Sequence, residues 1–284
     1  MTAIFKKYNK LVRPIKTVVM RIRVSLRQIV ALDEKNQIMT SNIYVTASWR
    51  DGRLKWLPYS KGANGVPLFN NLTDLVVPAT SIWTPDLFII NTAGTNGFIP
   101  ISSSNLAEIN FKGDVFLLLS VTNLQTKCKM YVYYFPFDTQ NCSIIVGSWK
   151  HSTDRINFET GVGKIDVASY QPHPIWTLKK VVVNSVFVTD RFAPSSNETN
   201  EDIAFYFSLN RGSGYYMANL VACFVLNCVT LLAYFLPFAT QVTLCILNSF
   251  YFLFDLCLKI KSYLISKFKR YDFIFNIFSA IVEP

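Results

Sequence analysis

The feature that most constrains this chain is a long segment without charge in its C-terminal third. No Asp, Glu, Lys or Arg occurs from Gly212 to Phe254. Within it, residues 215–236 would span about 33 Å as a helix, close to the roughly 30 Å hydrocarbon core of a bilayer. The alternative, a helix buried in a soluble protein, rarely runs so long without one charge. The segment therefore predicts a membrane-spanning helix.

The chain after this helix is harder to assign to a second span. Residues 241–254 are also uncharged, but residues 258–284 mix Lys and Arg with short apolar pieces. A second, outward crossing would leave this basic tail outside, against the tendency of positive charge to stay in the cytoplasm. We expect a transmembrane region at 212–257 with one or two helices, and a single span with a cytoplasmic tail agrees better with the charges.

Before the uncharged segment, the chain has the pattern of a β-domain. Residues 17–31 and 43–49 alternate apolar and polar side chains in places, which suits half-buried strands. Further apolar runs are separated by Gly, Pro, Asn and Ser clusters: 115–121, 130–135, 143–149, 181–189 and 203–209. This spacing predicts a mainly β fold, an immunoglobulin-like antiparallel β-sandwich over residues 1–211. Helix is expected there only in a short stretch before Pro14.

Cysteines and glycosylation motifs indicate an exported β-domain. Cys128 and Cys142 lie in the strand-rich region and look like a bridge, whereas the other four cysteines lie in or beside the uncharged segment. Asn-x-Ser/Thr motifs begin at Asn71, Asn141 and Asn197. The N-terminus has no apolar signal-peptide core, so either the true start is missing or export uses another route. We expect residues 1–211 to be extracellular.

Three other classes of function have little support. The formal net charge of +10 is scattered, without a basic patch or reading motif for nucleic acid. The cysteines lack the spacing or histidine partners of a zinc site, and no cofactor motif is present. The two histidines, His151 and His173, lie in no catalytic motif. We expect no enzyme, no metal, no cofactor and no nucleic-acid partner.

The most specific string of the chain runs from Cys128 to Cys142 and contains Phe135-Pro136-Phe137-Asp138. It resembles the loop that gives the Cys-loop receptors, the pentameric ligand-gated channels, their name. The resemblance implies a disulfide between the two cysteines, which would stabilise the fold by about 3 kcal/mol in the chain-entropy model.

Other matches extend the resemblance over roughly residues 4–246. Residues 8–14 are similar to the family's N-terminal helix, and residues 33–40 to its first inter-strand loop and following strand. The strings Trp83-Thr84-Pro85-Asp86 and Gly147-Ser148-Trp149 resemble its first and second ligand-binding loops. Within the family, the sequence of these segments is most similar to that of nicotinic acetylcholine receptor subunits. An acetylcholine-like neurotransmitter and homologous subunits, in a hetero-pentamer, are the implied partners.

The resemblance also assigns ligand-binding side chains. An ammonium ligand is attracted to an electron-rich aromatic face, by about 0.5 to 2 kcal/mol, and Trp149 is the candidate for that face. Trp49 resembles the tryptophan supplied by the complementary side of a subunit interface, with Leu117 and Leu119 on a neighbouring strand. The remaining tryptophans are expected in the core: Trp56, Trp83 and Trp176.

Departures from the family pattern weaken the principal binding face. Ile90 stands where α-type nicotinic subunits carry a tyrosine, and Ser195-Ser196 where they carry paired cysteines. Ala193 and Asn200 occupy the positions of the flanking tyrosines. These differences favour a non-α subunit that lends Trp49 to a neighbour's site.

The resemblance further implies how binding is coupled to a pore. Glu34, in the first inter-strand loop, would pair with Arg211, just before the membrane. The Phe135-Pro136-Phe137 tip, followed by Asp138, would rest on the membrane domain. The alternative is that Glu34 and Arg211 are ordinary exposed surface charges.

The pore is where the resemblance ends. Residues 241–246 resemble the start of a pore-lining helix, but residues 247–250 depart from its pattern, and the linker 237–241 is short. We expect a truncated subunit of an acetylcholine-receptor-like channel, in a postsynaptic type of plasma membrane, that does not conduct alone. The alternative is a non-conducting, membrane-anchored ligand-binding or dominant-negative fragment.

Overall fold

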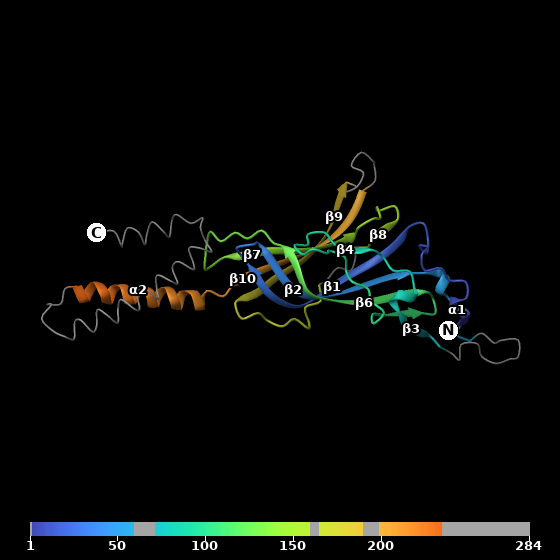
Figure 1. The fold of residues 1–284 in the computed structure, drawn as a ribbon, viewed down its shortest axis with the longest axis horizontal. Coiled ribbons are helices and arrows are strands. Elements are labelled where there is room, and N and C mark those ends of the chain that lie inside the picture. Colours follow the sequence, from blue (N-terminus) through green and yellow to red (C-terminus); the bar gives the residue numbers. More distant parts are fainter. Residues whose placement is uncertain (1, 60–71, 160–164, 190–198, 235–284) are drawn as a thin grey trace.

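A computed structural model describes residues 2–59, 72–159, 165–189 and 199–234 of this chain. Two β-sheets form most of the described part, and a single long helix, α2 (Gly214–Tyr234), projects from one end of them (Figure 1). The short helix α1 (Thr2–Phe5) lies at the opposite end. Two short 3-10 helices complete the elements: η1 (Gly52–Leu54) and η2 (Ala79–Ser81).

The larger sheet has six strands in the order β3-β5-β6-β2-β1-β8. All pairs are antiparallel except β1 with β8. Alternation along the chain gives every long strand one buried and one outward face, as a half-buried sheet requires. The strand bounds are Val18–Asp33 (β1), Ile38–Arg50 (β2), Asp74–Pro78 (β3), Leu106–Asn110 (β5), Asp114–Lys127 (β6) and Ile156–Phe158 (β8).

The smaller sheet has four antiparallel strands in the order β4-β7-β10-β9. Its strands are β4 (Leu87–Ile89), β7 (Thr139–Ser148), β9 (Trp176–Thr189) and β10 (Thr199–Arg211). The strand β10 is central and ends at Arg211, three residues before α2 begins. This direct connection makes the end of β10 the junction between the sheets and the helix.

The core lies between the two sheets and is built from their inward-facing side chains. Val24, Val45 and Leu117 of the larger sheet and Ile144 and Phe205 of the smaller one are fully buried. At about 25 cal/mol per Å² of apolar surface removed from water, this packing is the main source of stability. The predicted mainly β, sandwich-like architecture is confirmed.

Two local predictions differ from the structure. Residues 130–135 form no strand: 130–132 are irregular and 133–135 form a turn, because the disulfide-closed loop places Tyr131, Tyr133 and Tyr134 in solvent rather than in a sheet. Helix near the N-terminus is restricted to α1, and most of the chain from there to β1 is turn and bend.

The helix α2 begins close to where the uncharged segment begins. Among the helices that the structure describes, none is both long and apolar enough to cross a membrane. The pore-like segment 241–254 and the tail 258–284 lie outside the described residues. The predicted transmembrane region therefore stays a prediction.

Candidate functional site

A disulfide joins Cys128, directly after β6, to Cys142 on β7, with the two Cα atoms 5.0 Å apart. Inside the loop that it closes, the Gln140 amide donates to the Tyr131 carbonyl (2.7 Å) and accepts from the Tyr131 N–H (2.8 Å). One disulfide and two hydrogen bonds thus hold the base of the loop in one conformation. The implied pairing of these cysteines agrees with the structure.

Arg211 lies where this loop, the turn between β1 and β2, and the end of β10 meet. Its side chain donates to Glu34 Oε1 (2.7 Å) and, through Nε and Nη2, to Asp138 Oδ1 (2.7 Å) and Oδ2 (3.0 Å). Arg211 is only 2% exposed and both carboxylates are almost entirely covered. The alternative that Glu34 and Arg211 are ordinary surface charges is wrong.

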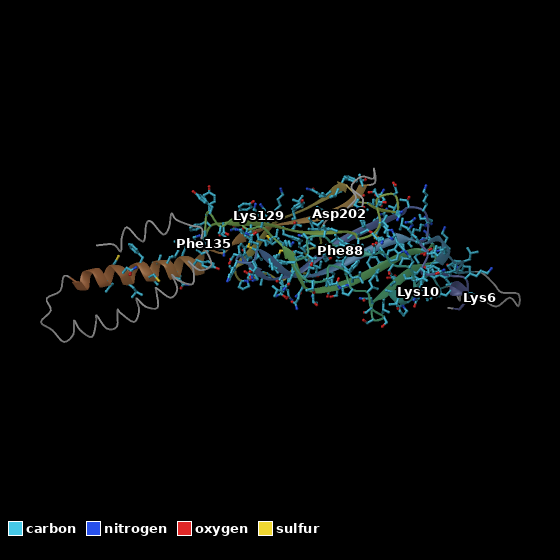
Figure 2. All side chains as sticks on the ribbon, turned by 45° about the horizontal axis from the view of Figure 1, so that its top comes forward. Lys6, Lys10, Phe88, Lys129, Phe135 and Asp202 are labelled. Atoms are coloured by element: carbon cyan, nitrogen blue, oxygen red, sulfur yellow. A yellow bond between two sulfur atoms is a disulfide. The ribbon has the colours of Figure 1, made fainter. Side chains whose placement is uncertain are left out.

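Aromatic rings surround the same guanidinium. Its central carbon lies 4.3 Å from the ring centre of Trp176, 5.0 Å from that of Phe135 and 5.4 Å from that of Tyr216. Tyr216 belongs to α2, and its ring packs edge-on against Phe135 at 5.0 Å. We call Arg211, Glu34, Asp138, Phe135, Trp176 and Tyr216 the Arg211 cage. It connects the disulfide loop to the first turn of α2, at the end of the sheets where Phe135 is labelled in Figure 2.

The positive charge of Arg211 is maintained by its contacts within the cage. Burial alone would lower the pKa of Arg211, but the hydrogen bonds and charges of Asp138 and Glu34 raise it above the ordinary value of arginine. The cation is therefore permanent. Within the disulfide loop, Phe135 packs into the cage, whereas Phe137 is exposed to solvent. Phe135 of the Phe135-Pro136-Phe137 tip thus contacts Tyr216 of the helix.

A second group of aromatic side chains surrounds Trp149, at the end of β7. The ring centre of Trp149 lies 4.3 Å from that of Phe88 and 5.9 Å from that of Phe98, and the two phenylalanines are 4.9 Å apart. Asp86 positions this segment, because its carboxylate accepts from Ser148 Oγ (2.7 Å) and from the Lys150 N–H (2.7 Å). The predicted first and second binding loops therefore meet.

Sequence reasoning missed the two phenylalanines of this aromatic group. The sequence could have indicated Phe88, because it follows Trp83-Thr84-Pro85-Asp86 by two residues. It also lies two positions before Ile90, and residues two apart in an extended segment share a face. Phe98 lies outside the named strands and pairs with Phe88 in an isolated antiparallel β-bridge. Ile90 is half-buried and its N–H donates to the Ile145 carbonyl (2.8 Å), which fixes the backbone beside the group.

The three side chains expected on the complementary face of a subunit interface are buried. Trp49 is 4% exposed and packs edge-on against Trp83, with ring centres 5.9 Å apart. Leu117 and Leu119 are completely covered. The expectation that they face a neighbouring subunit disagrees with the structure, because side chains alternate along a strand and these positions belong to its inward set.

The opposite face of the same strands is outward. Phe116 and Leu118 of β6 are 46% and 47% exposed, and Tyr44 of the neighbouring strand β2 is half-buried. Tyr44 is in register with Ser25 of β1 and Ser120 of β6. We call the outward side chains of β1, β2 and β6 around Tyr44 the outer face.

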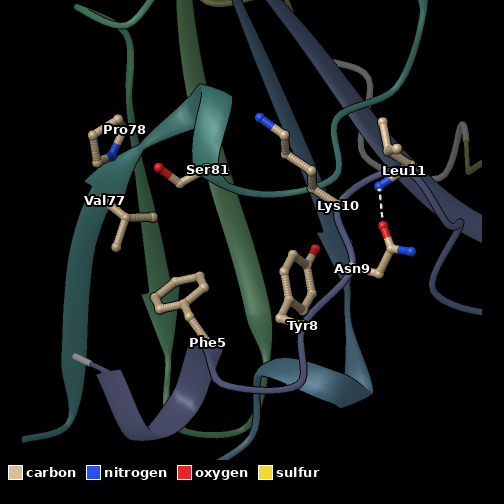
Figure 3. A pocket seen from close by; sticks show the side chains of 8 residues that line it. All are labelled: Phe5, Tyr8, Asn9, Lys10, Leu11, Val77, Pro78 and Ser81. Carbon is tan, nitrogen blue, oxygen red and sulfur yellow. Dashed lines mark hydrogen bonds between the residues drawn. The ribbon is translucent and has the colours of Figure 1, made fainter.

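One open hollow of about 580 Å³ lies at the N-terminal end of the described part, between α1 and η2 (Figure 3). Beside it, the Tyr8 hydroxyl donates to Asp51 Oδ2 (2.9 Å) and accepts from the Trp83 N–H (2.9 Å). Burial is the main cause that raises the pKa of Tyr8 to about 12, so the hydroxyl stays protonated. These bonds fasten the N-terminal segment, and the hollow is remote from the Arg211 cage (Figure 1).

The other predicted core tryptophans are placed as expected. Trp56 and Trp176 are buried, and the Trp56 indole donates to the Leu72 carbonyl (2.8 Å). Among the glycosylation candidates, Asn141 is exposed on β7, while Asn71 and Asn197 lie outside the described residues, as do Ala193 and Ser195-Ser196. Within the described ranges no group of three or more His, Cys, Asp or Glu could hold a metal ion.

Comparison with known proteins agrees with this geometry. The family model of the neurotransmitter-gated ion-channel ligand binding domain matches residues 1–213. The neuronal acetylcholine receptor subunit alpha-2 of Mus musculus is 30% identical over 250 residues, which are 86% of this chain and 46% of that subunit. The alpha-4 subunit of Gallus gallus is 29% identical over 250 residues, 86% of this chain and 38% of that subunit.

The chain thus spans less than half the length of these relatives. The match nevertheless includes both sheets, the disulfide loop and Arg211, which are the parts from which the sites above are built. The chain belongs to the Cys-loop receptor family, and residues 1–213 are a nicotinic-receptor-like ligand-binding domain of a neurotransmitter-gated ion channel.

Proposed function

We propose that this chain is a subunit of a pentameric, acetylcholine-receptor-like channel in the plasma membrane, with residues 1–211 outside the cell and a membrane region at 212–257. The observation that carries the proposal is the Arg211 cage, which joins the disulfide loop, the β1–β2 turn and α2 through one buried cation. A movement of the sheets has a direct path to the helix there. The gating-coupling residues are Glu34, Phe135, Pro136, Phe137, Asp138 and Arg211.

The cage suits coupling because its members come from separate elements. A ligand shifts a conformational equilibrium only through its different affinities for two states. Glu34 binds Nη1 of the guanidinium and Asp138 binds Nε and Nη2, so a small displacement of either loop changes how the positive charge is shared. The cage thus transmits the bias produced by the ligand and does not create it.

The ligand site is proposed to be shared between two subunits. Trp149, with Phe88 and Phe98, would form one half, beside Ile90. The second half would be the outer face of the neighbouring subunit. Tyr44, Phe116 and Leu118 replace the buried Trp49, Leu117 and Leu119 in that role, because a contact between subunits needs exposed surface.

A second candidate function is a non-conducting subunit that binds ligand or partners without forming a pore. It is favoured by the sequence after residue 246, where the pore-helix pattern is lost and a basic tail follows. A non-α role, in which the chain contributes mainly its outer face, is compatible with both candidates.

Current recordings distinguish these functions. The full chain is expressed alone and together with a nicotinic alpha-2-type subunit, and acetylcholine-evoked current and surface co-purification are measured. We expect no current from the chain alone, and co-purification with altered current in the pair. Acetylcholine-gated current from the chain alone would support a complete pore, and the absence of surface co-assembly would contradict the proposed subunit role.

Charge-neutral variants test the cage within the same assay. Glu34→Gln keeps the side-chain shape but removes the charge that Arg211 binds. We expect a reduced maximal response without loss of surface expression. Glu159→Gln is the matched control, because Glu159 pairs with Arg21 on the exposed surface (2.7 Å) and has no contact with the cage.

A further inference from the structure

The open hollow between α1 and η2 has walls that are mostly apolar. Phe5 and Tyr8 form one wall, with ring centres 5.9 Å apart, and Val77 and Pro78 at the end of β3 form another (Figure 3). Its volume of about 580 Å³ lies within the range of roughly 300–1,000 Å³ that small-molecule sites occupy. The hollow therefore has the size and the lining that suit a small ligand with an apolar body.

The walls are held in place by contacts outside the hollow. The Tyr8 hydroxyl is bonded to Asp51 and to the Trp83 N–H (both 2.9 Å), and the guanidinium carbon of Arg53 lies 4.7 Å from the centre of its ring. Val77 is only 2% exposed and belongs to a strand that pairs with β5. Side chains that are already fixed lose little conformational entropy when a ligand binds. Apolar contact with these walls thus contributes to affinity at a small ordering cost.

Lys10 supplies a charged group at the edge of the hollow. Its side chain is exposed, and Nζ donates to the Thr80 carbonyl of η2 (2.9 Å). A lysine ammonium has three donors, so two of them remain for a ligand beside this bond. Among the residues that the structure describes, no ion pair joins Lys10 to a carboxylate. Its positive charge is therefore available to an anion.

The surroundings of the hollow also favour a negative ligand. None of its eight lining residues is Asp or Glu. Asp51, which Tyr8 binds, is already paired with Arg53 (2.8 Å). Residues 6–16 contain five Lys or Arg and no acidic residue. A cationic head group would be repelled here, whereas a carboxylate would be attracted.

We propose that this hollow binds a medium-chain fatty acid, with its carboxylate on Lys10 and its alkyl chain against the apolar walls. The hollow lies at the opposite end of the sheets from α2 (Figure 1), so the ligand is a dissolved amphiphile and not part of a bilayer. The proposal goes beyond the proposed function and does not depend on it, because all of the contacts come from one chain.

Equilibrium dialysis tests the ligand class. The full chain in amphipol is titrated with radiolabelled octanoate, and amphipol alone serves as the blank. We expect saturable binding of a single octanoate per chain. Octanol and octylamine should compete about tenfold less well or worse, because neither carries the negative charge that Lys10 binds. Hexanoate, which is shorter by two methylenes, should bind more weakly by about two- to fourfold per methylene.

Variants of the lining residues test the location of the site. Lys10→Met keeps the apolar stem without the charge and should weaken octanoate binding by about tenfold or more, whereas Lys10→Arg should stay within about threefold. Ser81→Trp places a large ring in the hollow from an exposed position and should abolish binding. The matched control is Lys112→Met. Lys112 is exposed, lies 5.5 Å from the centre of the Phe111 ring and does not line the hollow, so its loss should change nothing.

Urea unfolding of each variant shows whether the fold is intact. If Lys10→Met fails to fold, Lys10→Arg and Ser81→Trp still separate retained from blocked binding. Absence of saturable octanoate binding to the unchanged chain would overturn this inference and leave the proposed function standing. Saturable binding that neither Lys10→Met nor Ser81→Trp alters would also overturn it. Competition by octylamine as strong as that by unlabelled octanoate would overturn it as well, because the apolar walls alone would then select the ligand.

Discussion

The two ends of the proposed signal path differ in how their residues are held. At the Arg211 cage, opposite charges and aromatic rings from four elements converge on one buried guanidinium. On the outer face, side chains lie at outward positions of a sheet, and strand register decides which of them are neighbours. Attraction between charges and rings determines which residues form the cage, whereas alternation along the strands determines which residues lie on the outer face.

This difference explains why sequence reasoning succeeded at one end and failed at the other. A charge pair remains a charge pair whatever the local twist, so Glu34 and Arg211 were correctly expected to meet. Facing direction reverses with every residue along a strand, so a small error of alignment exchanges core and surface. Trp49 and Tyr44 lie on the same strand, five positions apart, and therefore on opposite faces.

Removing the cation at the cage should have the largest effect. Arg211→Ala leaves Glu34 and Asp138 buried without their partner, which typically costs about 3–5 kcal/mol, and also removes the ring contacts. We expect a corresponding fall in the free energy of unfolding, measured with urea and tryptophan fluorescence on the full chain in detergent. Arg50→Ala, which breaks an exposed pair, should change little. Equal effects would show that the cage is no more than a surface pair.

Truncating each of the two aromatic residues of β2 tests which face of the strand is buried. Trp49→Ala removes a buried side chain packed on Trp83 and should cost about 3–5 kcal/mol of unfolding free energy. Tyr44→Ala, at a half-buried position, should cost much less. The reverse order in the same urea titration would contradict the strand register.

Removing the disulfide should weaken the cage, because the loop that it closes carries Phe135 and Asp138. Replacing both Cys128 and Cys142 by Ala removes the loop constraint and should cost about 3 kcal/mol. Cys228→Ala, on α2, is the control, because this cysteine is free. Thermal unfolding of the full chain, with and without reductant, compares the double variant with the Cys228→Ala control. An unchanged melting temperature in the double variant would show that the closed loop does not support the cage.

Acid should loosen the strand that carries Trp176, with the smallest effect. His173 Nδ1 accepts from the N–H groups of Ile175 and Trp176 (both 3.1 Å), and burial lowers the pKa of His173 despite its bond to the Val30 carbonyl. The unfolded chain thus binds this proton more readily. Stability from the neutral ring is complete above about pH 6.5 and is lost as pH falls toward the lower folded value. His173→Asn should flatten this part of the unfolding profile, and an unchanged slope would contradict the assignment.

Much of the domain could be predicted because its strands are strongly patterned. The alternation in β1 and β2 and the apolar runs of β6 and β10 indicated a sandwich, and the disulfide loop indicated its family. What could not be predicted depends on contacts between distant segments. Phe98 joins the aromatic group of Trp149 through an isolated β-bridge to Phe88, and Arg27 reaches Tyr44 only because β1 and β2 pair in a particular register.

The account depends most on the claim that ligand is read by the outward, not the inward, residues of β2. Agonist displacement curves on the full chain co-assembled with a nicotinic alpha-2-type subunit test this directly. We predict that Tyr44→Ala shifts the apparent affinity of the bound probe by about tenfold, equivalent to roughly 1.4 kcal/mol, while Trp49→Phe, a conservative change in the core, leaves it unchanged. A shift with Trp49→Phe and none with Tyr44→Ala, at equal surface expression, would contradict the account.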